Sequence, residues 1–147
     1  MAHANSLANT VIWARGLSKV YGTGSTEFHA LSDVNLEIRS GQLTLLMGPS
    51  GSGKTTLLSM LGCILRASAG RLELLGEQIT GLPESALPRL RRDLIGFVFQ
   101  GFNLFPALSA AENVALALDL RGVGAKAARL RAEQLLVEVG LKDRMRA

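Results

Sequence analysis

The spacing of hydrophobic and polar positions changes several times along the chain, and five segments have the pattern of β-strands. They are residues 11–17, 34–38, 43–47, 71–75 and 95–99. Apolar and polar residues alternate in 34–38, which predicts a strand with one exposed face. The apolar runs at 43–47 and 95–99 are continuous, which predicts strands that are covered on both faces.

Four other segments have helical spacing, and three of them lie in the second half of the chain. They are residues 55–65, 84–93, 110–121 and 125–139. Ser109 and Glu112 have the spacing of a capping box at the start of the third helix. Pro88 limits the second helix, and Gly140 ends the last one. Strands therefore come first, then a strand–helix unit and then helices, an order that predicts an α/β protein.

A glycine-rich loop separates an apolar run from a leucine-rich helix. Gly48, Gly53, Lys54 and Thr55 satisfy the pattern G-x-x-x-x-G-K-[ST]. Glycines let successive backbone N–H groups point into one concavity, and the following helix adds the positive end of its dipole. The lysine brings a full charge to the β- and γ-phosphates of a nucleotide, and the threonine hydroxyl can bind Mg²⁺. Thr56 is placed to donate a further hydroxyl toward the α-phosphate.

The alternative to a phosphate site is a glycine-rich turn with an ordinary surface lysine. The loop follows a buried-strand pattern and precedes a leucine-rich helix, which is the context that a phosphate-binding loop requires. We therefore expect the loop to bind ATP with Mg²⁺. The predicted phosphate site consists of Gly48, Pro49, Ser50, Gly51, Ser52, Gly53, Lys54, Thr55 and Thr56.

Composition and charge add limits to this interpretation. The 147 residues carry a net charge of +4, and 48% of them are hydrophobic, which suits one folded domain. Basic residues concentrate after Arg121, where a solvated helix face is favoured over a nucleic-acid site because no aromatic residues are interleaved. The single cysteine, Cys63, lies among apolar residues and suits a reducing compartment. We expect a cytoplasmic protein, because neither a signal peptide nor a membrane-spanning run is recognisable.

The phosphate loop and two later segments together resemble the ATP-binding subunits of ABC transporters. Gly48 to Leu58 resembles their Walker A segment, and Ile95 to Pro106 resembles the region around their Q-loop. Glu112-Asn113-Val114 is also typical of them. The similarity extends from about Val11 to Arg144, and it is greatest to the branch that serves lipoprotein release and macrolide export.

The resemblance implies an α/β fold, namely the N-terminal part of a P-loop NTPase domain of the ABC class. An antiparallel β subdomain and a partial RecA-like core are expected at about residues 8–100. The start of a helical subdomain is expected at about residues 101–147.

The resemblance also implies roles for individual residues. Tyr21 matches the aromatic residue that stacks on adenine, although a half-buried loop tyrosine is the alternative from sequence alone. Gln100 matches the glutamine that reaches Mg²⁺ and the attacking water, in a loop that senses the transmembrane partner. Ser50 is an expected neighbour of the γ-phosphate. Lys54 and Gln100 are thus the catalytic candidates, and Thr55 and Gln100 are the metal-binding candidates.

Other motifs of the family are not found in this sequence. They are an L-S-G-G-Q signature, a strand ending in Asp-Glu and a switch histidine. The chain has no adjacent Asp-Glu pair, and both His3 and His29 precede the phosphate loop. We therefore expect a truncated ATPase domain that is not active alone and whose core sheet lacks flanking strands, leaving apolar surface exposed.

Two functions remain open from the sequence. The first is an ATP-binding subunit that forms a homodimer, binds a membrane permease at the inner face of the cell membrane, and couples ATP binding and hydrolysis to transport. The second is a non-catalytic remnant that holds nucleotide or permease. A third possibility, another P-loop enzyme such as a kinase or a GTPase, is disfavoured. The N-K-x-D motif of a GTPase is absent from the sequence, and Gln100 and its surroundings argue against both enzymes. The permease sets the transported substrate, so this sequence does not identify it.

Overall fold

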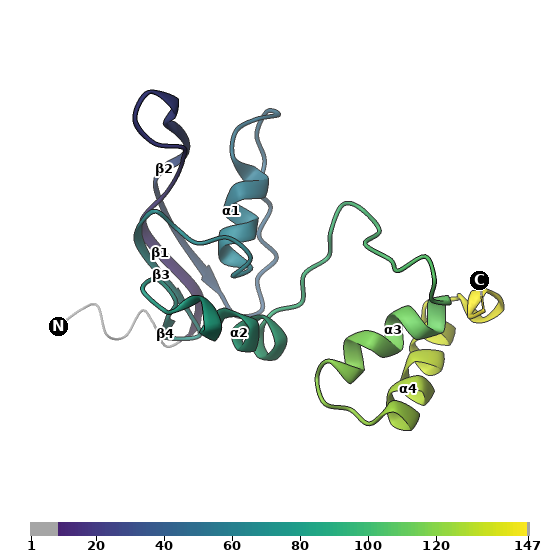
Figure 1. The fold of residues 1–147 in the computed structure, drawn as a ribbon. Coiled ribbons are helices and arrows are strands. Elements are labelled where there is room, and N and C mark those ends of the chain that lie inside the picture. The colour runs from purple at the N-terminus through teal and green to yellow at the C-terminus, as the bar shows by residue number, and fades with distance from the viewer. Residues whose placement is uncertain (1–8, 147) are drawn as a thin grey trace. The chain divides into compact units, whose positions relative to one another are not determined.

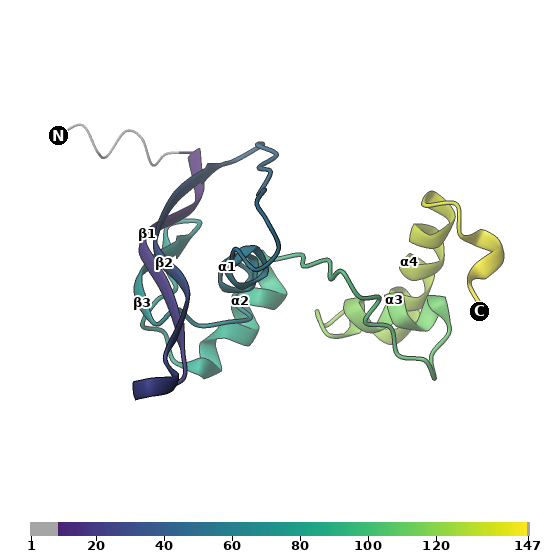
Figure 2. The same ribbon diagram turned by 90° about the horizontal axis from the view of Figure 1, so that it is seen from above.

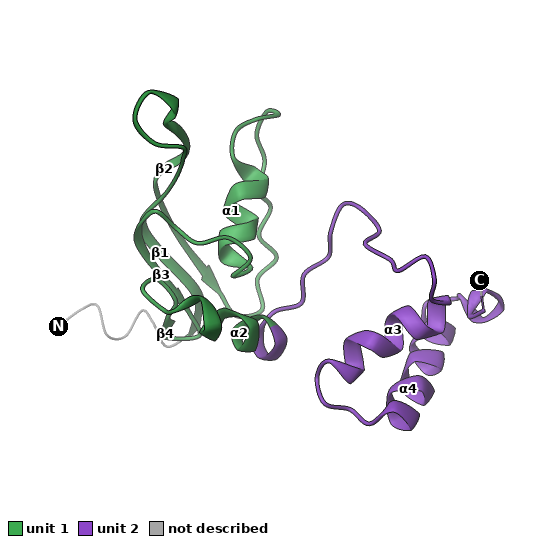
Figure 3. Cartoon of the chain, in the orientation of Figure 1, with its two compact units in different colours: residues 1–91 green, residues 92–147 purple. Residues whose placement is uncertain are grey.

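The computed structural model describes residues 9–146, so His3 and the first residue of the expected β subdomain lie outside the described part. The chain divides into two compact units, residues 1–91 and residues 92–147 (Figure 3). Each unit has its own packing and is described by itself.

A four-stranded antiparallel sheet is the framework of the first unit (Figure 1). Its strands are β1 (Thr10–Tyr21), β2 (Phe28–Arg39), β3 (Ala69–Leu74) and β4 (Glu77–Gln78), in the spatial order β2-β1-β3-β4. β1 and β2 form a long hairpin, and a 3-10 helix (Gly24–Thr26) lies in its turn. The strands predicted at 11–17, 34–38 and 71–75 overlap β1, β2 and β3. β1 and β2 are longer than predicted because their pairing continues past the apolar positions to the turn.

The two faces of this sheet differ in polarity. Four side chains on one face are almost completely buried: Ala14, Leu17, Leu72 and Leu74. On the other face Trp13 lies between Glu37 of β2 and Glu73 of β3. The guanidinium groups of Arg15 and Arg71 lie 5.1 and 5.7 Å from the centroid of the Trp13 ring. An antiparallel sheet with one core face and one solvated face has this division.

Two helices cover the apolar face of the sheet. They are α1 (Lys54–Leu61) and α2 (Leu87–Leu94), the latter preceded by a 3-10 turn (Glu84–Ala86), and Figure 2 shows both on the same side of the strands. Buried Leu57, Met60, Leu87 and Leu90 form their inner surfaces. α2 begins three residues later than predicted, which leaves Pro88 in the first turn, where a proline is tolerated.

The end of α1 is tied to α2 at Cys63. Arg91 donates a hydrogen bond of 2.8 Å to the Cys63 carbonyl. The cysteine is 1% exposed, and burial raises the pKa of its thiol, as its apolar neighbours in the sequence favour. α1 is shorter than predicted, because the chain leaves helical geometry at Cys63, whose φ is 54°.

The two continuous apolar runs, 43–47 and 95–99, do not form strands. Both have irregular backbone, and the exposed fractions are 100% for Leu43, 77% for Met47 and 95% for Val98. The prediction of buried strands is therefore wrong for both segments. A strand covered on both faces needs neighbouring strands, and no strand among residues 9–146 pairs with either segment. Their exposure agrees with the expected apolar surface of a core sheet without flanking strands.

The second unit begins with the last three residues of α2 and an irregular segment. Two packed helices, α3 (Ala110–Asp119) and α4 (Ala125–Glu138), and a 3-10 turn (Lys142–Arg144) follow. Ala128, Ala132 and Leu136 of α4 are buried. The capping box at α3 is confirmed: the Ser109 hydroxyl accepts from the Glu112 N–H, and the Glu112 carboxylate accepts from the Ser109 N–H at 2.8 Å. α4 ends as predicted before Gly140, whose φ is 76°.

Candidate nucleotide-binding site

The glycine loop forms a tight turn directly before α1. The Ser52 N–H donates to the Pro49 carbonyl at 3.3 Å, and Gly53 is the N-cap of the helix. The loop stands at the upper end of its unit in Figure 1 and is almost entirely exposed. A ligand can therefore approach the start of α1 from solvent.

Gly53 fixes the loop against the sheet. Its φ of 83° lies in the left-handed region, which a residue with a side chain rarely adopts. A Cβ at this position would lie 2.6 Å from the Ala30 carbonyl oxygen and 2.7 Å from the Leu31 Cδ2 atom of β2. Only glycine allows the backbone to approach β2 this closely. The start of α1 is thus held by the β1–β2 hairpin.

Lys54 closes the loop from within. Its ammonium group donates to the Gly48 carbonyl at 2.8 Å and to the Pro49 carbonyl at 2.6 Å, and it lies 3.4 Å from the Ser52 hydroxyl. These bonds join the first and last parts of the loop into a ring. The positive charge is therefore already placed within the loop.

The backbone and the local charge both favour an anion at this position. The first backbone hydrogen bond of α1 runs from the Leu57 N–H to the Gly53 carbonyl. No carbonyl in the described chain accepts from the N–H groups of Lys54, Thr55 or Thr56. Free N–H groups at a helix start attract phosphate. Residues 38–72 contain four basic residues and no Asp or Glu. The loop thus offers free N–H donors together with the positive charge of Lys54.

Tyr21 is the last residue of β1, directly before the turn of the β1–β2 hairpin. Its side chain is 42% exposed, and the Lys19 ammonium lies 5.0 Å from the centroid of its ring. An exposed ring with one face toward a cation keeps the other face available for stacking. The sequence interpretation missed Lys19. The signal that could have found it is the spacing of two residues, which places both side chains on one face of a strand.

Gln100 belongs to the second unit. It is exposed and lies in the irregular segment that precedes α3. Each unit stands by itself, so the joining of Gln100 to Lys54 and Thr55 at one metal stays a prediction. Within the described residues no cluster of three or more His, Cys, Asp or Glu side chains is placed to hold a metal ion. The assignment of the Thr55 hydroxyl as a ligand of Mg²⁺ likewise stays a prediction.

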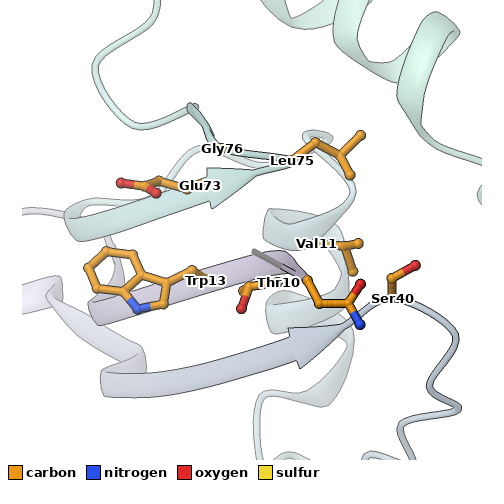
Figure 4. A pocket seen from close by; sticks show the side chains of 8 residues that line it. Thr10, Val11, Trp13, Ser40, Glu73, Leu75 and Gly76 are labelled. Atoms are coloured by element: carbon orange, nitrogen blue, oxygen red, sulfur yellow. The ribbon is translucent and has the colours of Figure 1, made fainter. Parts of the chain in front are cut away.

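A separate hollow of about 380 Å³ lies on the charged face of the sheet, next to Trp13 and Glu73 (Figure 4). None of the sequence-predicted site residues lines it. The Glu73 carboxylate is paired with Arg71 at 2.7 Å. None of the residues that line the hollow is Lys or Arg, so it offers no positive charge to a phosphate, and the glycine loop is the better candidate.

Comparison with known proteins decides the family. The family model described as ABC transporter matches residues 31–147. The chain belongs to the ABC transporter family. The predicted resemblance and the α/β fold are thereby confirmed. Members of the family bind ATP, usually with Mg²⁺, and act with membrane permease subunits. None of the helices that the structure describes is long and apolar enough to cross a membrane.

Individual relatives within the family are similar over most of this chain. An uncharacterized ABC transporter ATP-binding protein of Thermotoga maritima is 43% identical over 127 residues, which are 86% of this chain and 54% of the relative. The lipoprotein-releasing system ATP-binding protein LolD 1 of Caulobacter vibrioides is 44% identical over 136 residues, which are 92% of this chain and 58% of the relative. The chain therefore spans little more than half of these relatives.

A solved structure agrees with these sequence relatives. It is a dimeric post-hydrolysis state of the ATP-binding cassette MJ0796 bound to ADP and Pi, with a TM-score of 0.83 and 37% identity. The match covers 92% of this chain and 60% of that one. At this identity the likeness supports the family as well as the fold.

Proposed function

We propose that the chain binds Mg-ATP through the glycine loop, as the ATP-binding part of an ABC transporter. The observation that carries this proposal is the loop itself, because a lysine already set between two carbonyls adjoins three free helical N–H groups. In this site Lys54 binds the β- and γ-phosphates, Ser50 adjoins the γ-phosphate, and Thr55 binds Mg²⁺. The hydroxyl of Thr56 donates toward the α-phosphate.

We further propose that Tyr21 stacks on the adenine and that Gln100 reaches Mg²⁺ and the attacking water. Stacking tolerates any flat ring, so Tyr21 fixes the position of the base more than its identity. In a complete transporter these residues act in a homodimer that drives a membrane permease from the cytoplasmic side. The LolD 1 relative, which is named for a lipoprotein-releasing system, supports this context.

Binding and turnover are separable in this chain. A residue that polarises the attacking water is needed for hydrolysis, and the sequence has no adjacent Asp-Glu pair to supply it. We therefore propose that the chain holds nucleotide with little turnover. The alternative function, a non-catalytic remnant that binds nucleotide or permease, has the same binding behaviour.

The test is binding of a fluorescent ATP analogue to the purified chain in the presence of Mg²⁺. Replacing Lys54 with alanine removes the charge at the phosphates, and affinity should fall by roughly 10–100-fold, as expected for a hydrogen bond to a charged group. Lys126→Ala removes a lysine from the exposed start of α4 and should leave affinity within twofold. AMP should compete poorly, because it lacks the β- and γ-phosphates.

Equal affinity of wild type and Lys54→Ala for the ATP analogue would contradict the proposal. Steady-state phosphate release is measured on the same samples. Robust turnover that Lys54→Ala abolishes would contradict the separation of binding from hydrolysis.

A further inference from the structure

Asn113, in the first turn of α3, uses its side chain to hold the segment that precedes the helix. Its Oδ1 atom accepts from the Phe105 N–H at 2.8 Å. Its Nδ2 group donates to the carbonyls of Phe105, Leu108 and Ser109 at 3.2, 2.9 and 3.1 Å. Two hydrogens serve three acceptors, so at least one hydrogen is shared. The carboxamide thus binds both polar groups of the Phe105 backbone, as a neighbouring peptide group would.

The bonds of Asn113 enclose a reverse turn. The Leu108 N–H donates to the Phe105 carbonyl at 3.0 Å, and Pro106 occupies the second position of this turn, which proline favours. The turn therefore has its own hydrogen bond, and Asn113 attaches it to α3. Without that attachment the turn can persist while its position relative to the helix changes.

The segment upstream of this turn is residues 100–104, and it depends on the attachment. It contains neither helix nor strand, and no hydrogen bond described for it ties it to a helix. Phe102 is 92% exposed and Leu104 62% exposed. Burial thus contributes little to holding these side chains in place. The bond to Phe105 is the first fixed point after Gln100.

We propose that Asn113 is a positioning residue that fixes the segment 100–105 to the first turn of α3. A displacement of the α3–α4 pair is then passed to the segment that carries Gln100, and the reverse also holds. The relevance of this coupling to nucleotide turnover rests on the function proposed above for Gln100. The anchoring itself does not, and it can be tested without nucleotide.

The alternative is that Asn113 stabilises only the start of α3. Asn113→Asp separates the two roles, because aspartate keeps the size of the side chain and one acceptor but replaces two donors with an oxygen. At neutral pH this carboxylate faces three carbonyl oxygens and should release the turn. Asn103→Asp is the matched control: it makes the same change of charge in the same segment, at an exposed residue with φ of 46°, a conformation that Asp also accepts.

The measurement is amide hydrogen exchange by NMR on the ¹⁵N-labelled chain. In Asn113→Asp the Phe105 amide should exchange at least about tenfold faster than in wild type, while the amides of α3 beyond its first turn change by less than about threefold. Asn103→Asp should leave the Phe105 amide unchanged.

Acid should restore the anchor in Asn113→Asp. A protonated aspartate regains one O–H donor and again resembles the amide, so Phe105 exchange relative to wild type should return toward one as pH falls. The surrounding carbonyls raise the pKa of the introduced carboxyl, so recovery begins above the ordinary range of an aspartate. The neighbouring charged residues, which are Glu112 of α3, Arg129 and Glu133 of α4, and Arg146, are the same in all three proteins, so comparison with wild type at each pH isolates the introduced carboxyl.

The proposal is overturned by unchanged Phe105 exchange in Asn113→Asp, by an equal effect in Asn103→Asp, or by no recovery in acid. Loss of protection along all of α3 by the same factor also overturns it, because the residue then serves only the helix. Binding of the fluorescent ATP analogue is measured in parallel. If wild type fails to bind, the proposed function fails while the result for Asn113 stands.

Discussion

β2 and the apolar segment 43–47 are neighbours in the sequence, and both have the composition of a strand, but only β2 forms one. β2 pairs along its length with β1, which reaches it through a short hairpin turn. The segment 43–47 has no strand partner in the described chain, and Leu43 and Leu45 are 100% and 75% exposed. A strand such as β2 thus forms because its partner is close in the sequence, whereas a strand of a core sheet needs partner strands that are distant in the sequence.

The glycine loop directly follows the unpaired segment 43–47, but like β2 it is held in place by contacts within its own unit. Lys54 bonds to the Gly48 carbonyl six residues earlier, and Gly53 packs on β2. Both contacts are supplied by residues near the loop in space and within its own unit. The phosphate cradle therefore depends on the β1–β2 hairpin rather than on the segment that leads into it.

The prediction with the largest expected effect compares a buried leucine of the sheet with an exposed leucine of the segment 43–47. Leu17 of β1 is 0% exposed and Leu43 is 100% exposed. Leu17→Ala should lower the free energy of unfolding of the first unit by about 2–5 kcal/mol, through lost burial and a cavity. Leu43→Ala should change it by less than about 0.5 kcal/mol. The fluorescence of Trp13, the single tryptophan, follows denaturant unfolding of this unit.

A large loss from Leu43→Ala would contradict the comparison, since it would mean that the segment 43–47 packs in solution. Such a loss with no effect of Leu17→Ala would reverse the assignment of core and surface. Circular dichroism before unfolding checks that both variants start from the same secondary structure.

The second prediction tests whether the hairpin holds the loop. Gly51 and Gly53 have φ values of 80° and 83°, but a Cβ at Gly51 meets nothing within 4 Å. Both alanine variants should lose about 1–2 kcal/mol through backbone strain. Gly53→Ala should lose roughly 1–3 kcal/mol more, because its methyl group forces α1 away from Ala30. The free energies of unfolding and the affinities for the ATP analogue are compared for the pair.

Equal losses in the two glycine variants would mean that β2 does not support the loop. A greater loss of nucleotide affinity in Gly51→Ala with equal stability would place the sensitive part of the cradle at its tip instead.

The parts of the structure that the sequence predicted share one property, which is that their determinants are close in the chain. The capping box at Ser109, the end of α4 at Gly140 and the alternation in β2 each depend on a few neighbouring residues. The wrong predictions, at 43–47 and 95–99, assumed neighbours that the residues themselves do not specify. The phosphate loop was recognisable because the residue types in its pattern determine its backbone conformation. The contact of Gly53 with Ala30 was not, because strand register is needed to know which residues meet.

The last prediction concerns the capping box of α3 and has the smallest effect. The Ser109 hydroxyl, followed by the Ser109 backbone N–H, lowers the pKa of Glu112 from its ordinary value of 4.5. A carboxyl whose pKa is lowered on folding stabilises the fold above its ordinary pKa, and the contribution is lost as pH falls through the lowered value. Ser109→Ala should destabilise α3 by about 1 kcal/mol at neutral pH.

The difference between wild type and Ser109→Ala should therefore narrow as the solution is acidified below pH 4.5, because protonation removes the charged partner that the hydroxyl serves. Amide exchange along α3 measures this difference at each pH. Ser40→Ala, in the exposed turn after β2, is the control and should show no such trend. If the difference in α3 stability between wild type and Ser109→Ala stays constant across the acid range, the Ser109 hydroxyl caps the helix without help from the Glu112 carboxylate. The capping contribution would then come from the hydrogen bond between the Ser109 hydroxyl and the Glu112 N–H alone. The bond that the Glu112 carboxylate accepts from the Ser109 N–H would add nothing to the stability of α3.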